Sequence, residues 1–472
     1  MAYNSWTPNS GGSFNQFTAP PSNITNDSLR RNYGLGSKIA EINPRETPFF
    51  TFLTRFAKEG TIDPIFKSME VRHQWQRRNF VQTALSGSAA TLAITAKCDY
   101  DRRGRKVKDG DPLHAAYFVL PGQVLAIGGM TYGGNNGTVY ARVSGVTHTN
   151  VDGSSDGYSA IKIDLLHHIA DDGTSTKLTG QTGLTRTAAA GTNYSCQVIG
   201  TAHGEGTGAP DGWHDWMNQA EGYCQIFKTA NEIVSGTLLS TELRGKKDEF
   251  LRVWTEKLKE HKMDINHAML FGVGRVTTSD GYPTTDATDS RSKRYTWGVL
   301  PYIQMFGQTQ PFTYANTSYD DFVDWMSVFF APEDGNDSTK ICLASRKIIA
   351  WFNKIGNGQS FLGNTMLQDA IKMQVKDIAN TFGFTMLKVT TIFGELILIA
   401  EPLLRNLWED YAILLDPKNI TYKYLNGNGR SRDTFITTNV QDNDVDGRKD
   451  MIITEAGLEI LLPETHCVIK FS

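Results

Sequence analysis

The residues whose spacing comes nearest to a known chemical site are the acidic ones near the carboxyl end. Asp442, Asp444 and Asp446 occupy the first, third and fifth positions of a calcium-binding EF-hand loop. Such a loop also needs a bidentate glutamate at the twelfth position, which here is Ile453, and Glu455 comes two residues late. We therefore interpret this segment as an Asp-rich turn and not as a metal site.

Other combinations that could support chemistry lack the required spacing. His167-His168 precede Asp171-Asp172, but adjacent side chains on a strand point to opposite faces, so we expect a solvated loop there. The segment 34–38, Gly-Leu-Gly-Ser-Lys, lacks the spacing of a phosphate-binding loop. The metalloprotease motif His-Glu-x-x-His does not occur. The sequence thus favours a protein that is not an enzyme and has no catalytic, cofactor-binding or metal-binding residues, although scattered residues can assemble a catalytic site in space.

Positive charge is concentrated in one part of the chain. Residues 45–110 contain 13 Lys and Arg against 7 Asp and Glu, while the whole chain has a net charge of −3. DNA-binding surfaces usually add aromatic platforms or a reading helix. Pairing with acidic surfaces of other copies is thus at least as good an interpretation as phosphate contact, and solvated charge is the plain alternative. We predict intersubunit contacts for Arg72, Trp75, Arg77, Arg102, Arg103 and Arg105.

The cysteines and the amino-terminal residues indicate the compartment. Five cysteines are scattered without any Cys-x-x-Cys pair, so neither a disulfide framework nor a zinc site is indicated. The polar opening, residues 1–6, does not resemble a signal peptide, and no run approaches the roughly 18 apolar residues of a membrane span. A reducing, cytosolic compartment fits best.

The elements along the chain indicate mixed α and β structure. Residues 1–36 are rich in Asn, Ser, Pro and Gly, which predicts an arm ordered by partners. The segment 47–53 predicts a short helix entered through a proline, and period-two alternation from Met69 to Trp75 predicts an exposed strand. Glycine-punctuated alternation over 111–205 predicts a small all-β insertion. The strand before it and the strand 222–228 would then be two limbs of one extended loop.

The strongest helical pattern covers residues 239–272. Apolar residues recur at three-, four- and seven-residue offsets on one face, and we expect Gly272 to end the helix with positive φ. The face consists of Phe250, Leu251, Trp254, Leu258, Ile265 and Met269. Beyond it the sequence predicts a helix over 320–330, a strand that turns at Ser345 into a second helix, and mostly strands from 385 to 472.

Taken in this order, the chain resembles tailed-bacteriophage major capsid proteins of the Hong-Kong-phage (HK-ninety-seven) fold. Four marks carry the resemblance through their order and spacing. They are Thr47-Pro48-Phe49, the passage from Tyr223-Cys224-Gln225-Ile226-Phe227 to Ser235-Gly236-Thr237, Phe393-Gly394-Glu395-Leu396 running to Glu401-Pro402-Leu403-Leu404, and the stretch 411–417. The resemblance implies an α+β fold with a spine helix, an extended loop that overlaps a neighbour, and no cofactor.

The resemblance also implies a division of the chain and a set of partners. The expected parts are an amino-terminal arm (1–45), the start of a peripheral domain with the first limb (46–110), a β-rich insertion (111–205), the return limb and spine helix (206–289), an axial domain (290–440), and closing strands that return to the peripheral domain (441–472). The implied assembly is a homo-oligomer of hexamers and pentamers in an icosahedral shell around double-stranded DNA, which it contacts nonspecifically. Expected partners are a scaffolding protein, a portal and decoration proteins, with no membrane, in a virion capsid assembled in the host cytoplasm.

Two other hypotheses remain open at this stage. The Gly- and Thr-rich insertion would also suit a phage tail protein or a surface glycan-binding protein. A hydrolase built from dispersed residues is the third.

Overall fold

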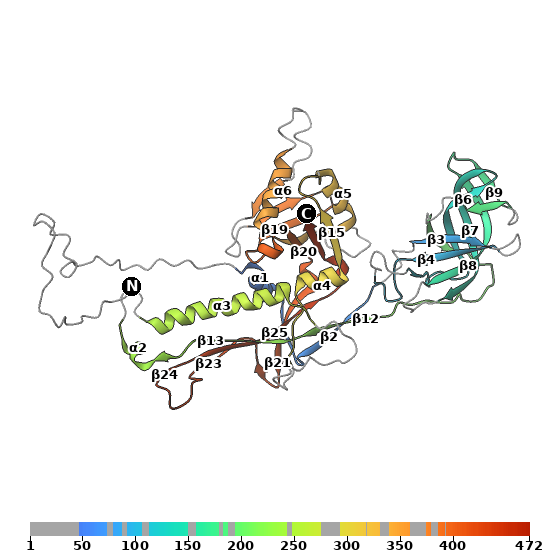
Figure 1. Cartoon of the computed structure of the whole chain (residues 1–472). Coiled ribbons are helices and arrows are strands. Elements are labelled where there is room, and N and C mark those ends of the chain that lie inside the picture. Colours follow the sequence, from blue (N-terminus) through green and yellow to red (C-terminus); the bar gives the residue numbers. More distant parts are fainter. Residues whose placement is uncertain are drawn as a thin grey trace, which may run out of the picture.

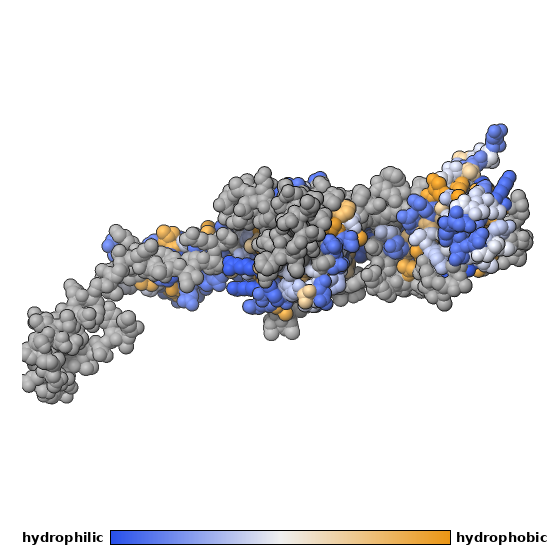
Figure 2. All heavy atoms as spheres, turned by 90° about the horizontal axis from the view of Figure 1, so that it is seen from above, coloured by the Kyte–Doolittle hydropathy of each residue, from blue (hydrophilic) through white to orange (hydrophobic). Residues whose placement is uncertain are grey.

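The protein is described here by a computed structural model, in which a body and a small β domain are joined by a narrow ribbon (Figure 1). Seen from above, the molecule is elongated (Figure 2). The structure describes residues 47–72, 79–86, 92–105, 113–149, 157–178, 183–186, 194–242, 248–274, 293–317, 319–330, 339–358, 374–378, 386–391 and 393–472. The expected arm, the segment 34–38, Trp75 and Arg77 lie outside the described residues.

One part of the body is a six-stranded sheet packed against helices. Its strands are β1 (Lys58–Thr61), β13 (Gln225–Ala230), β21 (Ile420–Gly427), β22 (Arg430–Ser431), β23 (Phe435–Thr437) and β25 (Met451–Ile460). β25 is antiparallel to both β13 and β21, and β1 runs parallel to β21. The helices are α1 (Pro48–Phe56) and α3 (Glu249–Phe271). Apolar residues of both helices share one core with this sheet.

The spine helix α3 is shorter than the sequence pattern predicts. It begins after Asp248, whose carboxylate accepts a hydrogen bond from Leu251 N at 3.1 Å. The preceding residues form a separate short helix, α2 (Gly236–Ser240). Phe250, Ile265 and Met269 are buried as expected, but Leu251 is 59% exposed because it lies about 100° around the helix from Phe250.

Gly272 ends α3 as predicted, but its backbone conformation differs from the expected one. Its φ is −60°, so the helix does not close through a left-handed residue. The glycine is needed for close packing instead, because a Cβ at this position would lie 2.7 Å from the carbonyl oxygen of Thr296. Gly298 N donates to Gly272 O at 2.6 Å, which fixes the two segments together.

The other part of the body is a seven-stranded mixed sheet. The strand order is β15 (Gln308–Phe312), β26 (Cys467–Phe471), β20 (Tyr411–Leu415), β16 (Thr339–Ala344), β19 (Glu395–Ala400), β18 (Met386–Thr390) and β17 (Gln374–Ile378). Helices α5 (Tyr319–Phe329) and α6 (Arg346–Gly358) share an aromatic-rich core with this sheet, and α4 (Val299–Phe306) leads into β15. β26 pairs with β15 and β20. The last strand is therefore part of this sheet, whereas the sequence placed it with the closing strands of the peripheral domain.

The ribbon consists of two antiparallel strands, β2 (Ile65–Glu70) and β12 (Asn218–Tyr223). Glu70 is opposite Asn218, and Ile65 is opposite Tyr223. The sequence places the second limb at 222–228, but β12 ends at Tyr223 and residues 225–230 form β13 in the body sheet. The first limb also lies earlier in the sequence than expected, since β2 ends at Glu70, close to where the predicted strand begins.

The β domain at the end of the ribbon is a closed barrel. Its strands are β3 (Asn79–Ser86), β4 (Ala93–Cys98), β5 (His114–Ala115), β6 (Gln123–Tyr132), β7 (Asn135–Thr149), β8 (Tyr158–Ala170), β9 (Ser175–Lys177), β10 (Leu184–Arg186) and β11 (Tyr194–Thr201). The pairing of β4 with β8 closes the ring β4-β3-β11-β6-β7-β8, so these six strands leave no open edge in the ring. The barrel has its own apolar core.

The barrel includes residues that precede the predicted insertion. β3 and β4 come from the segment 46–110, which the sequence analysis assigned to the first limb. Alternate residues of β4, such as Ile94 and Ala96, point into the barrel core. His167 and His168 were expected in a solvated loop, but both lie on β8, and His168 is buried because its side of the strand faces inward.

Candidate functional site

A buried carboxylate, Glu70, joins the ribbon to the body. One of its oxygens accepts hydrogen bonds from Arg72 Nη1 and from Asn218 Nδ2, each at 2.9 Å. The other oxygen accepts from Leu462 N at 2.7 Å. Leu462 has a positive φ of 46° and stands directly before the short 3-10 helix η6 (Pro463–Thr465), which leads into β26. Glu70 therefore ties both limbs of the ribbon to one turn of the body.

Arg72 completes this junction with a second carboxylate. Its Nη2 lies 2.8 Å from Glu464 Oε2, and its side chain is almost fully buried. Burial lowers the pKa of Arg72, but the charges of Glu464 and Glu70 more than offset this, so that the pKa is raised above its ordinary value. Arg72, which the sequence analysis placed at a contact between copies, thus has its guanidinium engaged within its own chain.

The basic cluster that follows forms a tight turn against the junction. Asp101 Oδ1 accepts hydrogen bonds from Arg103 N at 2.9 Å and from Arg105 N at 2.8 Å. Gly104 has a φ of +77°, and a Cβ there would lie 2.5 Å from the Cβ of Arg72. This position therefore needs glycine both for its left-handed backbone and for its contact with Arg72.

The arginines of the turn have different surroundings. The guanidinium of Arg102 lies over the ring of Trp216 at 3.8 Å from the centroid, which is within the range of a cation–π contact. That of Arg105 lies 5.6 Å from the ring centroid of Phe306 at the end of α4. Arg103 is exposed. The turn thus contacts both the segment just before β12 and the body, and it leaves Arg103 facing solvent.

The face of the ribbon opposite Glu70 carries an apolar row. Met69 is 65% exposed, Val71 is 58% exposed, and Met217, just before β12, is 65% exposed. Since successive side chains of a strand alternate between faces, these three lie on the side away from Glu70 and Asn218. Large apolar side chains gathered on a projecting element are typical of a surface that becomes covered on association.

A second apolar surface lies at the end of the body farthest from the barrel. There β14 (Val234–Ser235) pairs with β24 (Gly447–Arg448), next to α2. Figure 2 shows hydrophobic atoms along this end of the molecule. The exposed aliphatic residues around this two-stranded pair are Ile233, Leu238, Leu239, Val440 and Val445. We call this set the distal apolar surface.

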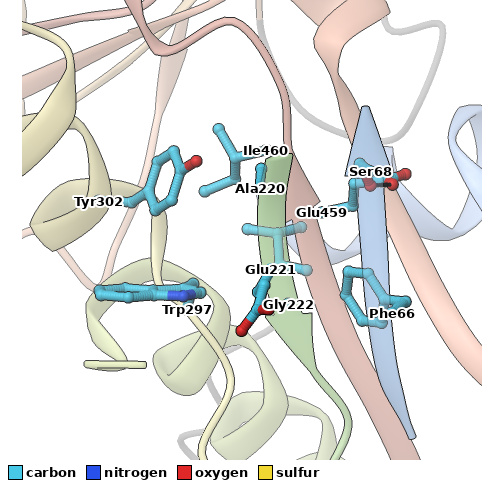
Figure 3. Close-up of a pocket in the computed structure, with 10 residues that line it drawn as sticks. Phe66, Ser68, Ala220, Glu221, Gly222, Trp297, Tyr302, Glu459 and Ile460 are labelled. Atoms are coloured by element: carbon cyan, nitrogen blue, oxygen red, sulfur yellow. Dashed lines mark hydrogen bonds between the residues drawn. The ribbon is translucent and has the colours of Figure 1, made fainter. Parts of the chain in front are cut away.

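A small pocket lies where the ribbon passes over the body (Figure 3). Trp297 and Tyr302 form one side, and Phe66, Ser68 and Glu459 lie across from them, with the β12 residues between (Figure 3). Ser68 Oγ donates a hydrogen bond to Glu459 Oε1, and the same glutamate pairs with Lys423 at 3.1 Å. These polar groups satisfy each other, so the pocket is a packing feature under the ribbon.

The other candidate sites from the sequence have structural explanations. The Asp-rich segment is a turn in which Val445 N donates to Asp442 O at 3.1 Å. Within the described ranges, no group of three His, Cys, Asp or Glu side chains could hold a metal ion. All five cysteines are buried, and none of them is in a disulfide. None of the helices in the described part of the chain is long and apolar enough to cross a membrane.

Glu70 and Glu464, which hold the junction, are not among the site residues predicted from the sequence. Their residue types are the same as those of ordinary solvated charges. The available signal was Glu70 itself, because it is an acidic residue on the polar face of a predicted strand whose other charged residues are basic.

One protein family and several solved structures are similar to this chain. A family model described as SU10 major capsid protein matches residues 16–471. No curated protein matches the chain. A solved structure similar to this chain is the capsid of cyanophage A-1(L), with a TM-score of 0.37, 12% identity, and coverage of 57% of this chain and 84% of that one. The capsid of cyanophage P-SCSP1u has a TM-score of 0.33 and 10% identity, with coverage of 58% of this chain and 80% of that one. A virus-like particle from Pyrococcus furiosus has a TM-score of 0.30 and 12% identity, with coverage of 54% of this chain and 78% of that one. The family model spans both the body and the barrel.

Proposed function

Since the chain belongs to the SU10 major capsid protein family, we propose that its copies assemble into the hexamers and pentamers of an icosahedral shell. Family membership makes the chain a major capsid protein of a phage head, a structural component of the virion and not an enzyme. The resemblance to phage major capsid proteins is thereby confirmed. Double-stranded DNA is the content that we propose for the shell, contacted without sequence specificity.

The observation that carries this proposal is the apolar row on the projecting ribbon. Met69, Val71 and Met217 stand on a two-stranded element outside the body, and each is more than half exposed. Burying one such side chain fully contributes about 1.5–3 kcal/mol. We propose that the ribbon lies over a neighbouring copy, which covers this row.

The distal apolar surface supports a second contact between copies. It lies at the opposite end of the body from the barrel, so one molecule can use both surfaces at once (Figure 1). Two different contact surfaces at opposite ends of an elongated subunit suit a closed shell, in which every copy has several neighbours.

The basic residues support a narrower proposal. Arg103 is exposed on the turn beside the junction, and Arg105 lies next to it. We propose that these two residues meet acidic surfaces of a neighbouring copy, with Arg102 contributing from its place over Trp216. Arg72 has a structural role in its own chain, and the contacts that we expect for Trp75 and Arg77 remain predictions.

The proposed partners are a scaffolding protein, a portal protein and decoration proteins, besides other copies of the chain. A closed barrel with its own core at the end of the ribbon is suited to contacts around the shell surface. The alternative of a tail or glycan-binding protein was based on the glycine- and threonine-rich insertion. The residues that the family model matches, 16–471, include the insertion, which supports the capsid interpretation over this alternative.

Assembly of the full chain tests the proposed function directly. The chain should be co-expressed with a scaffolding protein from the same phage and studied by light scattering and negative-stain electron microscopy. We expect closed shells or capsomers with five and six copies. Persistent monomers or slender trimers under these conditions would overturn the proposal.

A further inference from the structure

A second buried carboxyl group, Glu401, lies where three parts of the body meet. It follows β19 and is 2% exposed. Its Oε2 accepts a hydrogen bond from Phe49 N in α1 at 3.3 Å, and its Oε1 accepts one from Asn266 Nδ2 in the spine helix at 3.2 Å. Phe49 is 352 positions away from Glu401 in the sequence. One side chain thus joins α1, α3 and the segment after β19.

Helix α1 depends on this carboxyl group for its amino end. Thr47, at the N-cap position, makes no capping hydrogen bond with its side chain, and the first turn contains no acidic residue. The first N–H groups of a helix need acceptors from elsewhere. Glu401 therefore takes the place of a local cap for α1.

The surroundings of Glu401 oppose a negative charge. Among the described residues, no cation forms an ion pair with it. The charged groups on the neighbouring elements include Arg55 in α1, Asp264 and His267 in α3, Arg405 and Glu409 in its own loop, and Arg346 after β16. Burial raises the pKa of Glu401 to about 7, and hydrogen bonds from Phe49, Leu403 and Asn266 lower it in part.

Asn266 is a suitable partner for either state of the carboxyl group. Its side chain is fully buried, and an amide offers both a donor and an acceptor. With an ionised Glu401, Nδ2 donates to the carboxylate, as observed. With a protonated Glu401, the amide can turn so that Oδ1 accepts from the acid O–H.

We propose that Glu401 is a proton-operated latch, which fastens α1 to the spine helix when it carries a proton. When Glu401 is ionised, the closed state has to bury an unpaired negative charge, which is unfavourable. Opening of α1 therefore becomes easier once the proton leaves. The latch thus controls how firmly α1 is held against the body. This inference concerns the single subunit and does not depend on shell assembly.

The expected pH dependence follows from the sign of the pKa shift. A carboxyl group whose pKa is about 7 in the closed state and ordinary in the open state favours the closed state at low pH. The opening constant of α1 should therefore rise about tenfold per pH unit from ~5 to ~7 and level off above that. Hydrogen exchange of the α1 amides in the full-length subunit measures this constant, after correction for the intrinsic exchange rate.

Two variants separate the latch from general effects of pH. Glu401→Gln cannot ionise, so α1 protection should become independent of pH and should exceed that of the natural chain above pH 7. Glu409→Gln, which removes an exposed carboxylate in the same loop, should leave the pH dependence unchanged. Equal pH dependence in the natural chain and in Glu401→Gln would overturn the proposal.

Infrared spectroscopy gives a second readout that does not depend on stability. The natural chain should show the carbonyl band of a protonated carboxylic acid at pH 6, which disappears with a midpoint near 7 and is missing in Glu401→Gln. Asn266→Asp adds a second carboxyl group beside the first, so this midpoint should move upward. A natural chain without this band at pH 6 would mean that Glu401 is ionised there and that the latch does not exist.

Discussion

The guanidinium of Arg72 binds the carboxylate of Glu464 at 2.8 Å, although the two residues are 392 positions apart. Arg72 stands just after the outgoing limb of the ribbon, and Glu464 lies in the turn that leads into β26. Together with Glu70, which accepts hydrogen bonds from Arg72 and from Leu462 N, this pair determines how the ribbon leaves the body. Four predictions follow from this and from the other contacts described above.

Arg72→Met should destabilise the subunit by about 3–5 kcal/mol, because it leaves Glu70 and Glu464 buried without their cation. The free energy of unfolding in urea measures this change. Lys67→Met is the matched control, since Lys67 pairs with Glu221 at the surface of the same ribbon and should contribute at most about 1 kcal/mol. Similar losses for the two variants would show that the junction is no stronger than a surface ion pair.

Gly104→Ala should cost more stability than Gly134→Ala. Both glycines have positive φ, +77° and +87°, so both variants carry the backbone cost of about 1 kcal/mol. Only at position 104 would the new Cβ collide with Arg72, whereas the space around Gly134 is open within the described structure. Thermal unfolding of both variants measures the difference, and equal melting temperatures would contradict the close packing of the turn.

Acid should destabilise the subunit through His466. Its Nδ1 accepts from Asp416 N at 3.0 Å, and Nε2 lies 3.2 Å from Leu461 O, which requires a neutral ring with the proton on Nε2. Burial, reinforced by the charge of Lys340, lowers the pKa of His466 to about 3. Between about pH 3 and ~6.5 the folded state favours the neutral ring, whereas the unfolded state favours the protonated ring. The contribution of His466 is therefore complete above the unfolded pKa of ~6.5 and is lost at up to about 1.4 kcal/mol per pH unit as the pH falls toward 3.

Urea unfolding at several values between pH 7 and pH 4 tests the role of His466. His466→Asn should reduce the slope of stability with pH, at some loss of stability at pH 7, because the amide oxygen can still accept from Asp416 N. His214→Asn, at an exposed position, is the control and should keep the natural slope. An unchanged slope in His466→Asn would show that other groups govern the acid response.

Met69→Ser combined with Met217→Ser should lower the yield of shells or capsomers at least several-fold while leaving the stability of the subunit nearly unchanged. Both side chains are 65% exposed in the subunit, so they contribute little until a neighbour covers them. Ile199→Ser, which removes a 53% exposed side chain from the barrel, is the control. Assembly yield by electron microscopy, compared with circular dichroism of the subunit, separates the two effects. Full assembly of the double variant would exclude the apolar row as a contact between copies.

Several features of the fold could be predicted from the sequence because their signals are local. The proline entry at Pro48 and the N-cap at Ser345 each involve neighbouring residues, and α1 and α6 begin there as expected. The spine helix was recognisable from its apolar periodicity. The predicted helix began too early, however, and Leu251 was wrongly placed on the buried face. The order of the motifs was sufficient to identify the capsid family.

Only the tertiary structure decided which distant segments pair and which charges are buried. The closure of the barrel by β4 and β8, and the place of β26 beside β15, depend on strand register over long separations, which the alternation within a single strand does not specify. Arg72 and Glu401 have the residue types of solvated surface groups. Each becomes a buried junction only because packing brings its partners from remote parts of the chain and removes water from around its charge.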